Sequence, residues 1–185
     1  MKGLGTALIT PFTEDGKVDF QSLSNLIEHQ VAGGTDYLVI LGTTSEVPTL
    51  THQEQNAIIE YVVKQVAGRM PLVLGIGGNS TAAVVERIGE LKEQLIAHFA
   101  AILSVTPYYN RPQQEGLYQH FCAVAEASPL PIILYNVPKR TGVNLLPETT
   151  RRIYDAYPNK IMGIKEACNS VEQFTETVNI ANGDF

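Results

Sequence analysis

Four polar segments of the sequence each follow directly after an apolar run. They lie at residues 42–46, 106–110, 135–142 and 165–166, and they carry hydroxyl, phenol, guanidinium and amine groups. In parallel α/β folds the carboxyl ends of the strands lie at one end of the sheet, where active sites form. We therefore predict that these groups converge on a single site although they are far apart in the sequence.

Lys165 has the position with the clearest chemical meaning, because it follows the apolar run 161–164. Loss of hydration disfavours the ammonium form and lowers the pKa of a lysine. A neutral lysine amine can attack a ketone and form a Schiff base. The alternative is that Lys165 forms an ion pair with Glu166 or with another acid at the rim of the sheet.

Tyr135, Thr43, Thr44 and Arg140 are the other candidates. Tyr135 follows an apolar run at 132–134, and a phenol there can relay protons. Thr43 and Thr44 follow a glycine at a strand-to-helix turn, where hydroxyls and backbone N–H groups can hold a carboxylate. Arg140 can bind a carboxylate through two hydrogen bonds. The alternatives are a tyrosine at the rim of the sheet, turn and helix-cap chemistry for the threonines, and a solvated arginine.

The elements that must position these residues show as a repeat of apolar runs with helical periodicity between them. The runs begin near Ala7, Tyr37, Leu72, Ala101, Ile132 and Ile161, about 30 residues apart. Helix starts are indicated by Thr51 with Glu54, Ser80, Pro147 and Ser170. Strands that alternate with helices at this period predict a parallel sheet covered on both faces.

The fold class is therefore α/β, with either a doubly wound open sheet or a barrel. A complete (β/α)8 TIM barrel typically needs about 250 residues, and the 185 residues here hold six strand–helix units. We interpret residues 1–185 as a single incomplete barrel domain that has about six units and lacks the last two and any C-terminal extension. Without those strands we expect the isolated chain to be unstable or inactive.

Composition excludes several function classes. A hydrophobic fraction of 44% fits a globular protein, and a net charge of −6 argues against nucleic-acid binding. No apolar run is long enough for a membrane span, and we see no signal peptide. Cys122 and Cys168 fit reduced thiols in a cytoplasmic protein. The four histidines lack paired ligand spacing, so we predict no metal site.

Four motifs together resemble a known family. They are Gly-Thr-Thr-Ser-Glu at 42–46, Thr-Pro-Tyr-Tyr-Asn-Arg-Pro at 106–112, Tyr-Asn-Val-Pro-Lys-Arg-Thr-Gly at 135–142 and Gly-Ile-Lys-Glu-Ala at 163–167. The sequence is similar to the dihydrodipicolinate synthase family of Schiff-base pyruvate aldolases. This resemblance implies a (β/α) barrel lyase that condenses pyruvate with L-aspartate 4-semialdehyde, giving (4S)-4-hydroxy-2,3,4,5-tetrahydrodipicolinate in lysine and diaminopimelate biosynthesis. It implies no metal, nicotinamide or phosphate cofactor.

The resemblance also implies roles for residues at the matching positions. Lys165 matches the Schiff-base lysine, and Tyr135 matches the tyrosine that shuttles protons. Thr43 and Tyr109 match its relay partners. In the family this second tyrosine reaches into the site of a neighbouring subunit, which implies a homo-oligomer, a dimer or a tetramer.

The substrate carboxylates have matching residues as well. Thr44 matches a contact to the carboxylate of pyruvate, and Arg140 matches the arginine that receives the carboxylate of aspartate semialdehyde. Ser45 departs from the commoner glycine of this motif. Two alternatives stay open. One is another Schiff-base pyruvate lyase, such as N-acetylneuraminate lyase or a 2-keto-3-deoxy sugar acid aldolase. The other is a barrel module without catalytic activity.

Overall fold

The computed structural model describes residues 2–185, in which strands and helices alternate. The strands are β1 (Gly5–Ala7), β2 (Tyr37–Ile40), β3 (Leu72–Gly75), β4 (Phe99–Val105), β5 (Ile132–Asn136) and β6 (Ile161–Glu166). The longer helices are α1 (Phe20–Ala32), α2 (His52–Val66), α3 (Thr81–Gly89), α5 (Gln114–Ala127), α7 (Pro147–Ala156) and α8 (Val171–Ala181). The short helical segments are η1 (Thr43–Ser45), η2 (Val47–Thr49), α4 (Glu93–Ile96) and α6 (Pro138–Thr141). The α/β class predicted from the sequence is confirmed.

The chain divides into two compact units. The first contains residues 2–75 and 92–100, and the second contains residues 76–91 and 101–185. Strand β4 begins in the first unit and continues into the second. The interpretation of residues 1–185 as one incomplete barrel domain stays a prediction.

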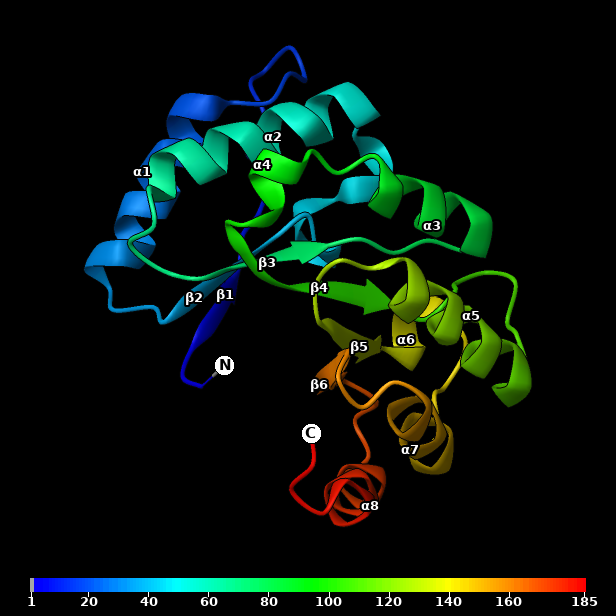
Figure 1. Cartoon of the computed structure of the whole chain (residues 1–185). Helices are drawn as coiled ribbons and strands as arrows, with labels where there is room; N and C mark the ends of the chain where they lie inside the picture. The colour runs from blue at the N-terminus through cyan, green and yellow to red at the C-terminus, as the bar shows by residue number, and fades with distance from the viewer. Residues whose placement is uncertain (1) are drawn as a thin grey trace. The chain divides into compact units, whose positions relative to one another are not determined.

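In the first unit, β1, β2 and β3 pair in parallel and in chain order, and α1 packs against α2 (Figure 1). Helix α2 begins with the predicted capping box, in which Thr51 and Glu54 satisfy each other's backbone N–H groups. The buried face of α2 recurs at helical spacing through Ile58, Ile59 and Val62. This spacing is the pattern that made the helix predictable.

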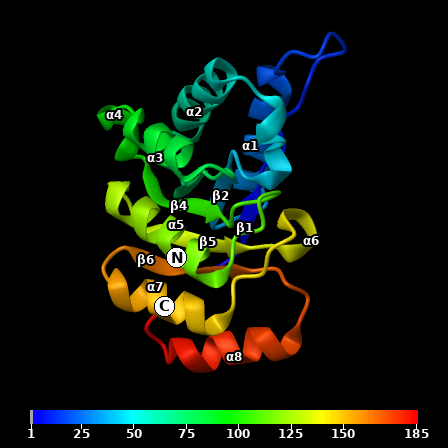
Figure 2. The ribbon, with the colours of Figure 1, turned by 90° about the vertical axis from the view of Figure 1, so that its right-hand side faces the viewer.

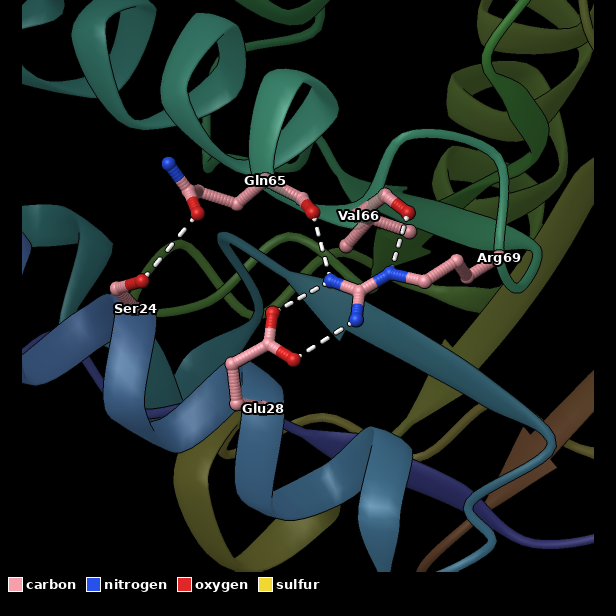
Figure 3. Close-up of polar contacts among 5 residues, drawn as sticks. All are labelled: Ser24, Glu28, Gln65, Val66 and Arg69. Carbon is pink, nitrogen blue, oxygen red and sulfur yellow. Dashed lines mark hydrogen bonds and ion pairs between the residues drawn. The ribbon is translucent and has the colours of Figure 1, made fainter.

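Arg69 closes the C-terminal end of α2 and joins it to α1 (Figure 3). Its guanidinium donates two hydrogen bonds to the carboxylate of Glu28, at 2.8 and 2.5 Å. It also donates to the backbone carbonyls of Gln65 and Val66, which lie in the last turn of α2. The guanidinium holds the pKa of Glu28 below its usual value. Nearby, the hydroxyl of Ser24 donates to the side chain of Gln65.

In the second unit, residues 102–105 of β4 pair in parallel with β5, and β5 pairs in parallel with β6. Helices α5, α7 and α8 lie side by side along these strands (Figure 2). The fully buried side chains include Phe121 of α5 and Leu134 of β5. As predicted, Ser80 caps α3, Pro147 opens α7 and Ser170 caps α8.

Two helices differ from the sequence pattern. Apolar residues at helical spacing continue from Ser80 as far as Leu95 and indicate one helix, but α3 ends at Gly89 and α4 begins at Glu93. Glycine has little helix propensity, and Lys92 is extended, so the chain breaks there. In α8 the large apolar side chains of Val171, Phe174 and Val178 are exposed, and that of Ile180 is half-buried. Its buried positions are Thr177 and Ala181 instead.

Candidate active site

The end of the β5–β6 pair brings together the two residues with the strongest predicted chemistry. Tyr135 and Lys165 are directly opposite each other in the register of the two parallel strands, so they share one face of the sheet. The Nζ atom of Lys165 lies 4.3 Å from the centroid of the Tyr135 ring. Tyr135 is buried, whereas Lys165 is exposed in the described chain. The Lys165 amine and the Tyr135 ring therefore lie against each other within the second unit, and their catalytic roles stay a prediction.

The environment of Lys165 favours a neutral amine more than open solvent does. Partial burial lowers the pKa of Lys165 below its ordinary value, because protein atoms replace some of the water that would solvate the ammonium ion. Among residues 2–185, none of the ion pairs includes Lys165. The alternative of an ion pair with Glu166 is therefore wrong for this structure. An ion pair would raise the pKa and work against nucleophilic attack.

The loop after β4 places Tyr109 at the surface beside α6. The Tyr109 residue is 86% exposed, and its backbone is in the left-handed region with φ of 69°. Its N–H donates to the carbonyl of Thr141 over 3.3 Å, and the side chain of Asn110 donates to the carbonyl of Asn79 over 2.7 Å. Two hydrogen bonds therefore hold the loop, while Tyr109 itself is exposed.

Arg140 lies in the short helix α6, directly after β5. Pro138 begins this helix, and Gly142 ends it with φ of 72°, a conformation that favours glycine. The Arg140 side chain is exposed, so its guanidinium is accessible to a ligand. Arg111 braces this turn, because its Nε donates to the carbonyl of Gly142 over 3.0 Å. Arg140 therefore lies in a short helix just after β5, and its role as a carboxylate-binding residue stays a prediction.

Thr43 and Thr44 lie in the first unit, within η1 after β2, and both are exposed. Their relation to Lys165 stays a prediction because Lys165 belongs to the other unit. Ser45, the departure from glycine, is buried, and its hydroxyl donates to the carbonyl of Leu8 over 2.7 Å. The hydroxyl of Thr10 donates in turn to the carbonyl of Ser45. Ser45 therefore fixes the turn through its own hydrogen bonds.

Asn136 and Glu166 lie on the opposite face of β5 and β6; the sequence suggested no role for Asn136, and for Glu166 only an ion pair with Lys165. Asn136 follows Tyr135, and Glu166 follows Lys165, so alternation turns both side chains to the other side of the sheet. The amide of Asn136 donates to the carboxylate of Glu166 at 3.0 and 3.2 Å. Their adjacency to the two chemical candidates is the sequence signal that could have identified them.

His120 is a second buried polar residue that sequence reasoning missed. Its Nδ1 atom is hydrogen bonded to the hydroxyl of Thr81 at 2.8 Å, and its Nε2 atom is buried without a partner among residues 2–185. Burial lowers the pKa of His120 to about 4. The ring is therefore neutral at pH 7.

We expect His120 to make folding stability pH dependent. The unfolded chain binds a proton at this histidine near pH 6.5, whereas the folded chain binds it only near pH 4. The free energy of unfolding should therefore fall by about 3 kcal/mol as pH decreases from 7 to 4. Denaturant unfolding of the unsubstituted protein and of His120→Gln at several pH values measures this difference. An equally steep pH dependence in His120→Gln would contradict the assignment.

Within residues 2–185, no three His, Cys, Asp or Glu side chains gather as metal ligands. The helices of this described part are also too short or too polar to cross a bilayer.

Sequence and structure comparisons both lead to one family. The model of the dihydrodipicolinate synthetase family matches residues 1–185. The 4-hydroxy-tetrahydrodipicolinate synthases of Parabacteroides distasonis and Bacillus subtilis are 51% and 47% identical to this chain, over 100% and 98% of its length. The chain spans about three fifths of these curated relatives, 63% and 61% of their lengths.

Solved structures agree with the sequence comparison. The 4-hydroxy-tetrahydrodipicolinate synthase of Methylacidiphilum fumariolicum SolV superposes with a TM-score of 0.93 at 39% identity, covering 100% of this chain and 60% of that one. A dihydrodipicolinate synthase from Acinetobacter baumannii, solved in complex with pyruvate, gives 0.92 at 41% identity, covering 99% and 61%. The six strand–helix units therefore have the fold of part of a TIM barrel, as the sequence predicted.

Proposed function

The chain belongs to the dihydrodipicolinate synthetase family, and on that premise we propose that the protein condenses pyruvate with L-aspartate 4-semialdehyde through a Schiff base on Lys165. The observation that carries this proposal is the Lys165 amine, which lies over the Tyr135 ring without a carboxylate partner among residues 2–185. Its lowered pKa supports the neutral form that the first step needs. The relative from Acinetobacter baumannii, solved with pyruvate, supports the choice of keto acid.

In the proposed reaction, the Lys165 amine attacks the ketone carbon of pyruvate, and the resulting carbinolamine loses water to give an iminium ion. The iminium withdraws electrons, so the methyl group loses a proton and an enamine forms. The enamine carbon bonds to the aldehyde carbon of the second substrate, whose oxygen takes up a proton. The amine of that substrate then attacks the iminium carbon and expels Lys165, which closes the ring and frees the enzyme.

The other residues have proposed roles around this cycle. Tyr135 moves protons at the carbinolamine and ring-closure steps, with Thr43 and Tyr109 as relay partners. Thr44 holds the carboxylate of pyruvate. We propose that the exposed ring of Tyr109 reaches the site of a second subunit in a homo-oligomer, a dimer or a tetramer. Cytoplasmic location is also proposed, and the two free cysteines are in keeping with it.

Arg140 distinguishes the proposed aldehyde substrate from the substrates of other Schiff-base lyases. We expect the full product of the gene to condense pyruvate with L-aspartate 4-semialdehyde and to leave N-acetylneuraminate and 2-keto-3-deoxygluconate uncleaved. Arg140→Ala should raise the KM for the semialdehyde about tenfold or more, because one carboxylate loses a paired cation. Steady-state kinetics with each substrate measures this effect.

The matched control is Lys139→Ala, which removes the neighbouring exposed cation of α6 and should leave the KM for the semialdehyde within about twofold. Cleavage of either sugar acid in preference to condensation would reject the substrate assignment in favour of the other lyases. Failure to bind or convert any keto acid would support the module without catalytic activity.

A further inference from the structure

A network of amide groups surrounds the carboxylate of Glu166, the residue directly after the candidate nucleophile. The Oε1 atom accepts hydrogen bonds from the Asn136 amide at 3.0 Å and from the backbone N–H of Cys168 at 2.9 Å. The Oε2 atom accepts from the Gln173 amide at 3.1 Å and from Asn136 at 3.2 Å. Both oxygens of an ionised carboxylate accept hydrogen bonds, so each of these N–H donors has an acceptor.

The network joins the end of β6, where Glu166 lies, to three other parts of the second unit. Asn136 is completely buried; its amide donates to the side chain of Asn144 at 2.8 Å, and its Oδ1 atom accepts the N–H of Leu145 at 2.9 Å. The Asn144 amide donates to Gln173 at 2.8 Å. The ends of β5 and β6, the segment before α7 and the first turn of α8 are thus tied to each other.

This network lies on the face opposite to the amine. In the parallel register, Tyr135 is paired with Lys165, and Asn136 is paired with Glu166 one position later. Successive side chains of a strand point to opposite faces. The end of β6 is therefore held on one face by Glu166, while the Lys165 amine reaches over the Tyr135 ring on the other.

We propose that Glu166 is a positioning residue for Lys165: its carboxylate, bound by Asn136, Gln173 and the Cys168 N–H, fixes the end of β6 so that the amine stays over the Tyr135 ring. The inference rests on the proposed Schiff-base function. The same hydrogen bonds hold the carboxylate away from the adjacent amine. The acid that follows Lys165 in the sequence is thereby prevented from becoming its ion-pair partner.

The nearly isosteric change Glu166→Gln tests the match between acceptors and donors. An amide at this position places an NH2 group where Oε1 or Oε2 now accepts, so at least one donor of Asn136, Gln173 or Cys168 loses its acceptor. Gln173→Leu loosens the same network from α8 and leaves the charge of Glu166 in place. Together the two variants separate the positioning of β6 from a simple effect of charge.

The experiment measures how fast the full product of the gene forms the pyruvate adduct, which is trapped with borohydride. The rate is measured at a series of pyruvate concentrations and at a series of pH values. We expect both variants to lower the rate at saturating pyruvate about tenfold or more, because a small displacement of the attacking atom is costly. The pyruvate concentration at half-maximal rate should change little. In Gln173→Leu the midpoint of the pH profile should move upward, as the freed amine gains water.

Glu176→Gln is the matched control, since it makes the same chemical change at an exposed position of α8 and should keep the unsubstituted rate and pH profile. Thermal unfolding of each variant shows the temperature range in which it is folded, and rates are compared there. Unchanged rates in folded Glu166→Gln and Gln173→Leu would overturn the positioning role. If only Glu166→Gln shifted the midpoint of the pH profile, the charge of Glu166 would act on the Lys165 amine, and the positioning role would be rejected. If the unsubstituted protein formed no adduct, the proposed function itself would fall and the inference with it.

Discussion

Replacing Lys165 with alanine should abolish formation of the pyruvate adduct and lower the condensation rate by about a thousandfold or more. The reason is that the reaction loses its only covalent attachment point, so pyruvate has no iminium through which to release its methyl proton. Lys165→Arg should be as inactive, because a guanidinium keeps the positive charge but does not lose its proton near neutral pH. Borohydride trapping and steady-state kinetics on the purified variants measure both effects.

Lys160 supplies the control for this change, because it lies just before β6 and thus at the opposite end of the same strand. Its amine donates to the carbonyl of Ser128, so Lys160→Ala should cost some stability. It should nevertheless keep adduct formation in the folded protein. Comparable adduct formation in Lys165→Ala and in the unsubstituted protein would rule out Lys165 as the nucleophile.

Tyr135→Phe should lower the rate about a hundredfold, which is within the range for loss of a general acid–base group. The substitution removes only the phenolic hydroxyl and keeps the buried ring on which the Lys165 amine lies. Binding of pyruvate should therefore change less than turnover, so kcat should fall more than KM rises. Single-turnover measurements that follow adduct formation and product release separately can locate the slowed step.

Tyr61→Phe is a matched control, because it removes a hydroxyl from α2 and keeps the packing of that ring against Phe20. It should be as active as the unsubstituted protein. An equal loss of rate in Tyr61→Phe and Tyr135→Phe would point to a general effect on folding. A fully active Tyr135→Phe would show that protons travel by another route.

The periodic features of the chain were predictable from the sequence. Strand starts at Tyr37, Leu72, Ile132 and Ile161 coincide with the observed ones, because each buried strand reads as a short apolar run between helices. Capping residues such as Thr51 and Ser80 were predictable for a local reason, since their side chains bond to N–H groups three residues away.

Long-range polar contacts were less predictable, because they depend on which side chains tertiary packing brings together. Lys165 and Glu166 are neighbours in sequence and suggested an ion pair, but strand alternation turned them to opposite faces. Nothing local to Glu166 indicated its bond to Gln173, which α8 supplies. His120 of α5 and Thr81 of α3 are 39 residues apart in the sequence, and their hydrogen bond joins the two helices. Helical periodicity alone does not show which helices pack together.

The helix end at Gly89 shows a different limit of the sequence pattern. The apolar residues Leu91 and Leu95 continue the helical spacing of α3. The helix nevertheless ends at Gly89, before either of them. Spacing records which residues are apolar, whereas the break depends on backbone propensity at Gly89 and on the extended conformation at Lys92. Sequence patterns therefore indicated the strands and their caps, whereas the helix break and the hydrogen bonds of Glu166 depend on features that spacing does not record.

Peptide mapping by mass spectrometry after incubation with pyruvate and borohydride is the most direct test of covalent capture by Lys165. We expect the full product of the gene to gain one reduced pyruvyl group, on the peptide that contains Lys165, and to gain none when pyruvate is left out. A modification confined to another lysine, or a protein that turns over substrate and forms no trapped adduct, would contradict the Schiff-base function.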